Sequence, residues 1–371
     1  MKYMMNYEKS YIQFLDIFRY ALNPDRQAIP NVKELDWYGF YHFAREQAIA
    51  GFLFEGVKRL GEKGIKPPFE LLMQWIALAE QIAGRNRHIN NKCLEIVKQF
   101  NEAGFQCVVL KGQGNALMYP NPLSRCSGDI DLLVKGNKKY IIKYVKQRYP
   151  HTKTAYQHID YPVFKDVEVE LHYLPTYLNN PIYNHRFQKW YNTIADGGWL
   201  MEEAELPEGA GAIPMPTVEF NIVFQLAHIM HHFFDEGIGL RQMIDYYYVL
   251  KRIEDPLRLP LYKGRNLEET LKYLGLWKFA GAVMYIMKEV LGLEDKYLIV
   301  PVDERRGKTL LNEILKGGNF GHYSGLDQNN ALKKYFQKTW RNAKLVKEYP
   351  AEALCEPFFR TWHYFWRLSH R

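Results

Sequence analysis

Two aspartates, Asp129 and Asp131, are the residues whose type and spacing point most directly to chemistry. They precede and enter an apolar run ending at Val134, which predicts a buried strand. Side chains two positions apart on a strand share a face, so both carboxylates point the same way. Adjacent carboxylates repel unless a cation lies between them, and oxygen ligands favour Mg²⁺ or Mn²⁺. The pair predicts a divalent-metal site, although an isolated Asp-x-Asp is more often solvated.

A second alternating segment supplies further ionisable side chains. In residues 167–172 the apolar positions alternate strictly with Glu168, Glu170 and His172, so these three side chains share one face of a predicted strand. A solvent-facing edge strand explains the same pattern, and explains it better when this segment is considered alone. If the strand lies beside the aspartates, Glu170 becomes a third metal ligand or a general base, with Glu168 in reserve.

A strand, a glycine turn and a helix start precede the aspartates. Residues 105–110 form a short β-rich run, and Lys111 and Gly112 lead from it into a helix that ends before Pro120. The free N–H groups and positive dipole end of a helix N-terminus suit a phosphate, and Lys111 would add a full charge. The spacing of a P-loop is absent, and an ordinary βα turn explains these residues when they are considered alone.

The predicted C-terminal helices carry two polar pairs at four-residue spacing. His228 and His232 therefore share a helical face. Ile229 stands where the catalytic glutamate of a His-Glu-x-x-His zinc site would be, so histidines in the core or beside other ligands fit better than a zinc site. Arg241 and Asp245 are also four apart, a spacing that allows them to form an ion pair.

Helical patterns surround the predicted strands on both sides. Residues 1–100 repeat apolar residues every three or four positions, residues 101–213 contain the strands, and residues 214–371 are helical again. The strands include a hairpin of residues 155–164 with 167–173. The sequence thus predicts an α+β protein in three regions: an N-terminal helical region, an α/β core with a small mixed sheet, and a C-terminal helical domain.

Composition narrows the class of protein less than the motifs do. The 371 residues include four widely spaced cysteines without a CxxC pair, and neither a leader peptide nor a membrane-spanning run is recognisable. We therefore expect a cytoplasmic protein without a membrane partner. A net charge of +8 is compatible with a nucleotide, a nucleic acid or a phosphorylated glycan as partner, but the charges are spread along the chain. Residues 358–371, rich in aromatic and basic side chains, are predicted to dock as a helix through their aromatic face.

These motifs resemble those of the uncharacterised bacterial nucleotidyltransferase-like family, a branch of the polymerase-β-type nucleotidyltransferase superfamily. The resemblance covers residues 90–250, and its motifs are Leu110-Lys111-Gly112, Tyr119-Pro120, Arg125, the segment from Gly128 to Val134, and the segment from Val169 to His172. It implies a nucleotidyltransferase-type sheet in which a glycine-bearing helix start follows the first strand. Two acids then lie on the next strand, and a third acid lies on a later one.

The resemblance also implies an activity, in which a nucleoside monophosphate passes from an NTP such as ATP to an acceptor and pyrophosphate is released. Asp129, Asp131 and Glu170 would hold Mg²⁺ or Mn²⁺, and His172 would orient Glu170 or the acceptor. The residues implied to bind the nucleotide are Lys111, Gly112, Arg125, Ser127 and Gly128. Residues that would support the site or contact the acceptor, whether a small molecule, RNA or a protein, are His228, His232, Arg241 and Asp245.

The sequence departs from the superfamily at the glycine turn, and two other classes of protein stay open. Gln113 replaces the usual second Gly or Ser, and the distance from Gly112 to Asp129 is longer than usual, so phosphate binding at Gly112 is less well supported than metal binding. A glycosyltransferase would hold Mn²⁺ and a sugar nucleotide at Asp-x-Asp. In glycosyltransferases, however, the motif usually follows a long nucleotide-binding α/β region, whereas here helices precede a single strand. A non-catalytic nucleotide-binding or assembly protein on the same fold is the other alternative. The oligomeric state is not predicted.

Overall fold

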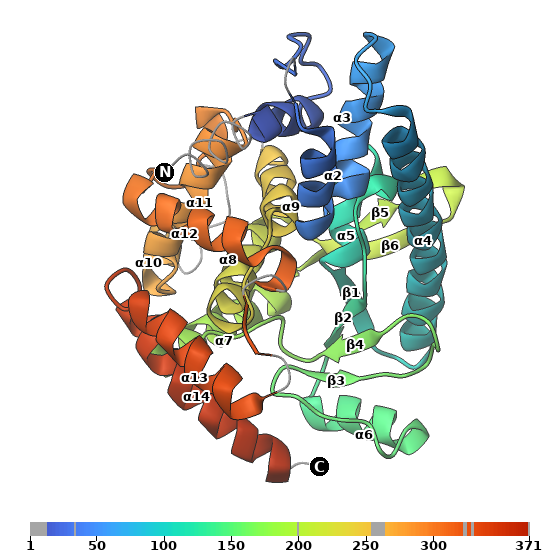
Figure 1. Ribbon diagram of the computed structural model, residues 1–371. Helices are drawn as coiled ribbons and strands as arrows, with labels where there is room; N and C mark the ends of the chain where they lie inside the picture. The colour runs from blue at the N-terminus through green and yellow to red at the C-terminus, as the bar shows by residue number, and fades with distance from the viewer. Residues whose placement is uncertain are drawn as a thin grey trace.

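The computed structural model describes residues 13–32, 35–198, 200–253, 264–321, 325–327 and 330–369. The start of the chain, where no leader was recognised, and residues 370–371 of the predicted tail helix lie outside these ranges. Helices surround a small four-stranded mixed sheet, and a two-stranded sheet lies beside it (Figure 1). The predicted α+β class with a small sheet flanked by helices is confirmed. No helix in the described ranges has both the length and the apolar character needed to cross a bilayer.

The elements follow the predicted order of helices, strands and helices. After a helix over residues 13–22, the N-terminal helices are α2 (Trp37–Glu46), α3 (Ala50–Glu62) and α4 (Phe69–Glu102). The α/β part contains β1 (Gln106–Leu110), α5 (Gly112–Ala116), η1 (Pro122–Ser124), β2 (Ile130–Lys135), α6 (Lys138–Arg148), β3 (His158–Asp160), β4 (Val169–His172), α7 (Pro181–Asp196), β5 (Met201–Glu205), η2 (Pro207–Gly209) and β6 (Ala212–Pro216). The remaining elements are α8 (Val218–Asp235), α9 (Leu240–Lys251), α10 (Leu267–Tyr273), α11 (Trp277–Tyr285), η4 (Ile286–Val290), η5 (Asp295–Tyr297), α12 (Glu304–Gly317), η6 (Asn319–Gly321), α13 (Ala331–Lys344) and α14 (Pro350–Ser369).

The main sheet has the strand order β1-β2-β4-β3. Strands β2 and β4 are parallel, because α6 carries the chain across between them, whereas β1–β2 and β3–β4 are antiparallel. The predicted hairpin is therefore present as β3 and β4, with shorter strands than expected. Because β4 lies between two other strands, the alternative of a solvent-facing edge strand is wrong. The register places Glu170 directly beside Asp131.

The two faces of the sheet pack into different hydrophobic clusters. Val108 and Leu110 of β1 belong to a cluster shared with the N-terminal helices and with α8, α9 and α11. Cys107 and Val109, which point the other way, pack with the C-terminal half of α4 and with α6. Helices from both ends of the chain thus contribute to one core. The predicted boundaries near residues 100 and 213 stay predictions.

The C-terminal part is more finely divided than the apolar pattern indicated. The helix predicted over residues 267–291 is interrupted at Gly275, whose positive φ of 75° ends α10 in a conformation that glycine adopts readily. The helix α12 and the β5–β6 sheet were not predicted.

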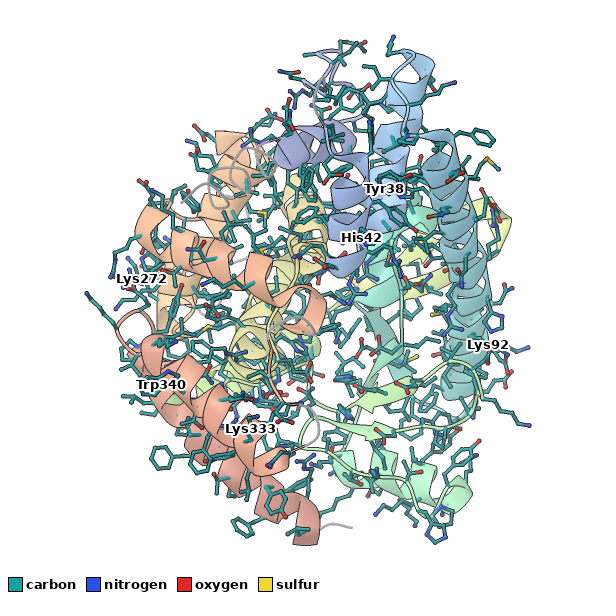
Figure 2. The ribbon with its side chains drawn as sticks, in the orientation of Figure 1. Tyr38, His42, Lys92, Lys272, Lys333 and Trp340 are labelled. Atoms are coloured by element: carbon teal, nitrogen blue, oxygen red, sulfur yellow. The ribbon has the colours of Figure 1, made fainter. Side chains whose placement is uncertain are left out.

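The last helix, α14, packs against the molecule through one side. Figure 1 shows α13 and α14 as a pair on the side of the molecule opposite α4. Phe359 and His363 of α14 face a cavity, whereas Phe358 is 78% exposed. Figure 2 labels Trp340 at the outer side of α13, where it is also exposed. The prediction that the tail docks through its aromatic face is therefore correct for only part of its aromatic residues.

Candidate active site

The turn after β1 brings a lysine to the aspartates. Lys111 and Gly112 both have positive φ values, 47° and 34°, so the chain turns sharply before α5. A non-glycine residue in this region costs of order 1–3 kcal/mol and is found where the surroundings hold it in place. Here Lys111 Nζ lies 3.0 Å from Asp131 Oδ1. The turn thus orients the lysine into the site.

Asp131, Glu170 and His172 form the centre of the site. Asp131 is 4% exposed, and its neighbour in the parallel register is Glu170. The Nε2 atom of His172 lies 2.8 Å from Asp131 Oδ1 and 3.1 Å from Glu170 Oε2. Because one nitrogen of His172 contacts both carboxylates, it holds them close together. The His172 side chain itself is buried under the site.

The charges of this group stabilise one another. Burial alone would lower the pKa of His172, but hydrogen bonds to Asp131 and Glu170 outweigh it and raise the pKa to about 9, so the ring is an imidazolium at neutral pH. Burial would raise the pKa of Asp131, yet the charges of Lys111 and His172 hold it well below its usual range. Burial would also raise the pKa of Glu170, but the hydrogen bond from His172 together with the charges of His158 and His172 lowers it.

Asp129 lies just before β2, and its side chain is exposed at the cavity. The charge of Asp131, followed by partial burial, raises the pKa of Asp129. Two carboxylates that oppose each other's ionisation are the arrangement that a bound cation relieves. Together with Glu170, they form the oxygen-rich set of ligands that Mg²⁺ and Mn²⁺ prefer. The residues present therefore fit the divalent ions that the sequence predicted.

His158 at the start of β3 is a site residue that the sequence did not reveal. It is paired with His172 in the β3–β4 register, and its Nδ1 atom lies 3.1 Å from Glu170 Oε2. Burial and the charge of His172 lower its pKa to about 4, so the ring is neutral. His158, Glu170 and His172 are close enough to share a metal ion. Because the Nε2–H of His172 is directed at carboxylates, oxygen ligation describes the site better. The sequence could have indicated His158 only through the pairing register of the β3–β4 hairpin, which places it opposite His172.

The site opens into a cavity of about 570 Å³. Most of the predicted site residues line it, namely Lys111, Gly112, Arg125, Gly128, Asp129, Asp131, Glu170, His228, His232, Arg241 and Asp245. The two others lie outside its lining. His172 lies beneath the carboxylates, and Ser127 accepts a hydrogen bond from Arg125 at 3.3 Å. Glu168, the reserve for the third acid, is exposed and does not line the cavity.

Two arginines have different surroundings from those expected. Arg125, predicted to bind nucleotide, is buried and forms an ion pair with Asp245, with 2.7 Å between Nη2 and Oδ2. The pair expected from spacing, Arg241 with Asp245, is replaced by this contact. Arg241 Nη1 instead donates to the carbonyl of Cys126 at 2.8 Å, and its guanidinium lies 5.2 Å from the ring centre of Phe320. Arg241 is thus held at the cavity wall with its charge available.

The wall opposite the carboxylates comes from α8 and α14. His228, His231 and His232 of α8 line the cavity together with Phe359 and Arg367 of α14. The sequence indicated the histidine spacing but gave no sign that α14 reaches the site. Tertiary contacts of α14, among them those with α8, bring the C-terminal helix here.

The sequence and the structure were compared with known proteins. No curated protein matches the sequence. Among solved structures, the chain is similar to the crystal structure of an antigenic nucleotidyltransferase-like protein from Paracoccidioides brasiliensis, with 9% identity and a TM-score of 0.36, over 58% of this chain and 94% of the other. The family model described as uncharacterised nucleotidyltransferase matches residues 33–292, a wider range than the motifs indicated, which includes the strands carrying Asp131 and Glu170. The protein belongs to this uncharacterised nucleotidyltransferase family.

Proposed function

We propose that this protein transfers a nucleoside monophosphate from an NTP to a hydroxyl group of an acceptor and releases pyrophosphate. The observation that supports this most is the register of β2 and β4. It places Asp131 and Glu170 side by side on the cavity, with Asp129 two residues before Asp131, just ahead of β2. Family membership supports the same class of reaction.

The carboxylates and cations of the cavity have separate roles in this proposal. Asp129, Asp131 and Glu170 would hold the divalent ions. Bound Mg²⁺ or Mn²⁺ stabilises both the entering and the leaving oxygen of such a displacement. Lys111 and Arg241 would neutralise the negative charge of the triphosphate. Arg125 also lines the cavity, but its guanidinium is paired with Asp245, so we assign it to supporting the wall.

The reaction forms one bond and breaks one. The acceptor oxygen bonds to the α-phosphorus, the bond from that phosphorus to the bridging oxygen breaks, and the electron pair leaves with pyrophosphate. The proton of the acceptor hydroxyl passes to Glu170. Because the pKa of Glu170 is lowered, it is a weak base, and we assign it first to ion binding and second to proton uptake.

The test is pyrophosphate release from each NTP with Mg²⁺ or Mn²⁺, in the presence of cell extract as the source of acceptor. We expect release that Glu170→Gln lowers by about 10²-fold or more, the scale for losing a general base, while NTP binding persists. Glu168→Gln is the matched control, because Glu168 is exposed just before the same strand. Turnover of a nucleotide sugar without pyrophosphate would instead establish the glycosyltransferase alternative. NTP binding without release would establish the non-catalytic one.

A further inference from the structure

We propose that the end of the cavity formed by α14 binds the acceptor, and that the acceptor is a small hydroxylated ring with an anionic group, as in a phosphorylated sugar. This inference rests on the proposed function and adds the class of acceptor to it. The residues that support it come from α14 and from the segments that α14 contacts. The helix α14 itself lies beyond the range that the family model matches.

The sheet order gives the cavity two distinguishable ends. Lys111 and Gly112 follow β1 at one edge of the sheet, and His158 belongs to β3 at the other edge. In an in-line displacement the entering oxygen approaches opposite the leaving group. If pyrophosphate leaves beside Lys111, the acceptor enters from the β3 side. Tyr156, two residues before His158, contacts α14 there, with its ring centre 5.6 Å from that of Phe359.

Three aromatic rings from separate segments meet at this end. The ring centre of Tyr177 lies 4.7 Å from that of Phe359 and 5.3 Å from that of Tyr156. All three side chains line the cavity. Such rings offer broad apolar faces against which the C–H face of a sugar ring can pack, while their edges leave room for polar groups.

Two buried histidines present unsatisfied polar atoms beside the aromatic rings. His228 and His231 are 7% and 5% exposed, and the Nδ1 atom of each has no hydrogen-bond partner in the described part of the chain. Burial lowers the pKa of both well below its usual range, so both rings are neutral. A neutral imidazole can donate or accept a hydrogen bond, and an unsatisfied buried polar atom is costly. Both side chains line the cavity, so a ring that rotates toward the ligand would satisfy its Nδ1 atom with a ligand hydroxyl group.

An arginine at the rim of the same wall is available to bind an anionic group. Arg360 pairs with Glu356, with 3.2 Å between Nε and Oε1. Arg367 is exposed on the cavity and has no ion pair among residues 330–369 and the other described ranges. It can therefore meet an anionic substituent. A cavity of about 570 Å³ lies in the range for small molecules, so it favours a small acceptor over RNA or a protein.

The test is calorimetry of the full chain with glucose 6-phosphate as the probe and no nucleotide present. We expect binding that Phe359→Ala weakens by about tenfold, the scale of an aromatic packing contact. Phe358→Ala is the matched control, since Phe358 is the preceding residue on α14 and is 78% exposed. Arg367→Gln should remove the preference for glucose 6-phosphate over glucose. Circular dichroism checks that each variant is folded.

The outcomes separate this inference from the proposed function. Equal affinity of Phe359→Ala and the parent, or no binding of a panel of hexose and pentose phosphates, would overturn the inference. A loss of affinity for ATP with Mg²⁺ in Phe359→Ala would also overturn it, because the rings would then hold the nucleobase. Sugar phosphate binding that depends on Phe359 supports the inference even if pyrophosphate is never released, in which case only the proposed function fails.

Discussion

Asp245 receives two hydrogen bonds from Arg125, from Nε at 2.8 Å and from Nη2 at 2.7 Å, and both side chains are buried. Tyr119 donates a third to the same carboxylate at 2.6 Å. Burial opposes the charge of Arg125, but Asp245 more than restores it, so the pKa of Arg125 is raised. The charge of Arg125 is thus neutralised within the wall by Asp245, whereas Arg241, which lines the same cavity, donates to a backbone carbonyl.

The two arginines should therefore respond differently to the same substitution. Arg241→Gln should weaken the binding of ATP with Mg²⁺ by about tenfold or more, the scale of a hydrogen bond to a charged group, with little loss of stability. Arg125→Gln should lower the free energy of unfolding by about 3–5 kcal/mol, because Asp245 stays buried without its partner. Calorimetry and urea unfolding measure the two effects. The reverse pattern would show that Arg125 binds the nucleotide.

A substitution at Asp129 should remove metal binding with little effect on stability. Asp129→Asn should abolish the binding of Mg²⁺ with ATP and change the unfolding free energy by less than about 0.5 kcal/mol, since the side chain is exposed and Asp131 repels it. Adding Asp131→Asn should cost about 3 kcal/mol more, because Lys111 and His172 lose their buried partner. Tight binding of Mg²⁺ with ATP by Asp129→Asn would exclude this position as the metal site.

Gly114 and Gly84 form a matched pair for testing the packing of the turn. A Cβ atom at Gly114 would lie 2.8 Å from the carbonyl oxygen of Val109, so Gly114→Ala should push α5 from β1 and destabilise by about 1–3 kcal/mol. Gly84 is in the middle of α4 with open space around it, so Gly84→Ala should stabilise by about 0.5–1 kcal/mol. Urea unfolding of both variants gives the comparison. Equal effects of the two substitutions would contradict this account of the turn.

Glu352 should make stability depend on pH. Burial raises its pKa to about 7 despite hydrogen bonds from the backbone N–H groups of Asn179 and Asn180. In the window from about 4.5, the ordinary value, to about 7, the folded state keeps a proton that the unfolded state has released. The contribution of Glu352 to the unfolding free energy should therefore be largest below this window and fall as the pH rises through it. Urea unfolding at several pH values should show a flatter profile for Glu352→Gln. An unchanged profile would assign the dependence to another group.

The local patterns of the sequence indicated which acidic side chains share a face of the sheet, and their chemistry stays a prediction. Asp129 and Asp131 before an apolar run, and Glu170 in an alternating one, are features within single segments, and period-two alternation fixes which side chains share a face. The position of β4 inside the sheet could not be derived from β4 itself, because strand order depends on which strands pair. This is why the segment considered alone favoured a solvent-facing edge strand.

Contacts between distant segments account for what the sequence did not reveal. The spacing of Arg241 and Asp245 predicted a pair, but Arg125, from another part of the chain, matches the carboxylate with two parallel hydrogen bonds and displaces that pairing. Similarly, the amphipathic pattern of α14 shows that one side is covered without showing what covers it. Phe358 and Phe359 look equivalent in sequence, yet only Phe359 lines the cavity.

The register of β2 and β4 also bears on how the chain reaches its native state. A slip by one residue would turn Glu170 into the apolar layer that now receives Leu132 and Leu171. A carboxylate without a partner in that layer would be strongly destabilising, so misaligned intermediates should be short-lived. Parallel strands pair slowly, because the intervening chain must close into a loop first. A penalty against the wrong register is therefore especially useful for such a pair. The acidic residues would thus guide the sheet to its correct alignment during folding, before any substrate is bound.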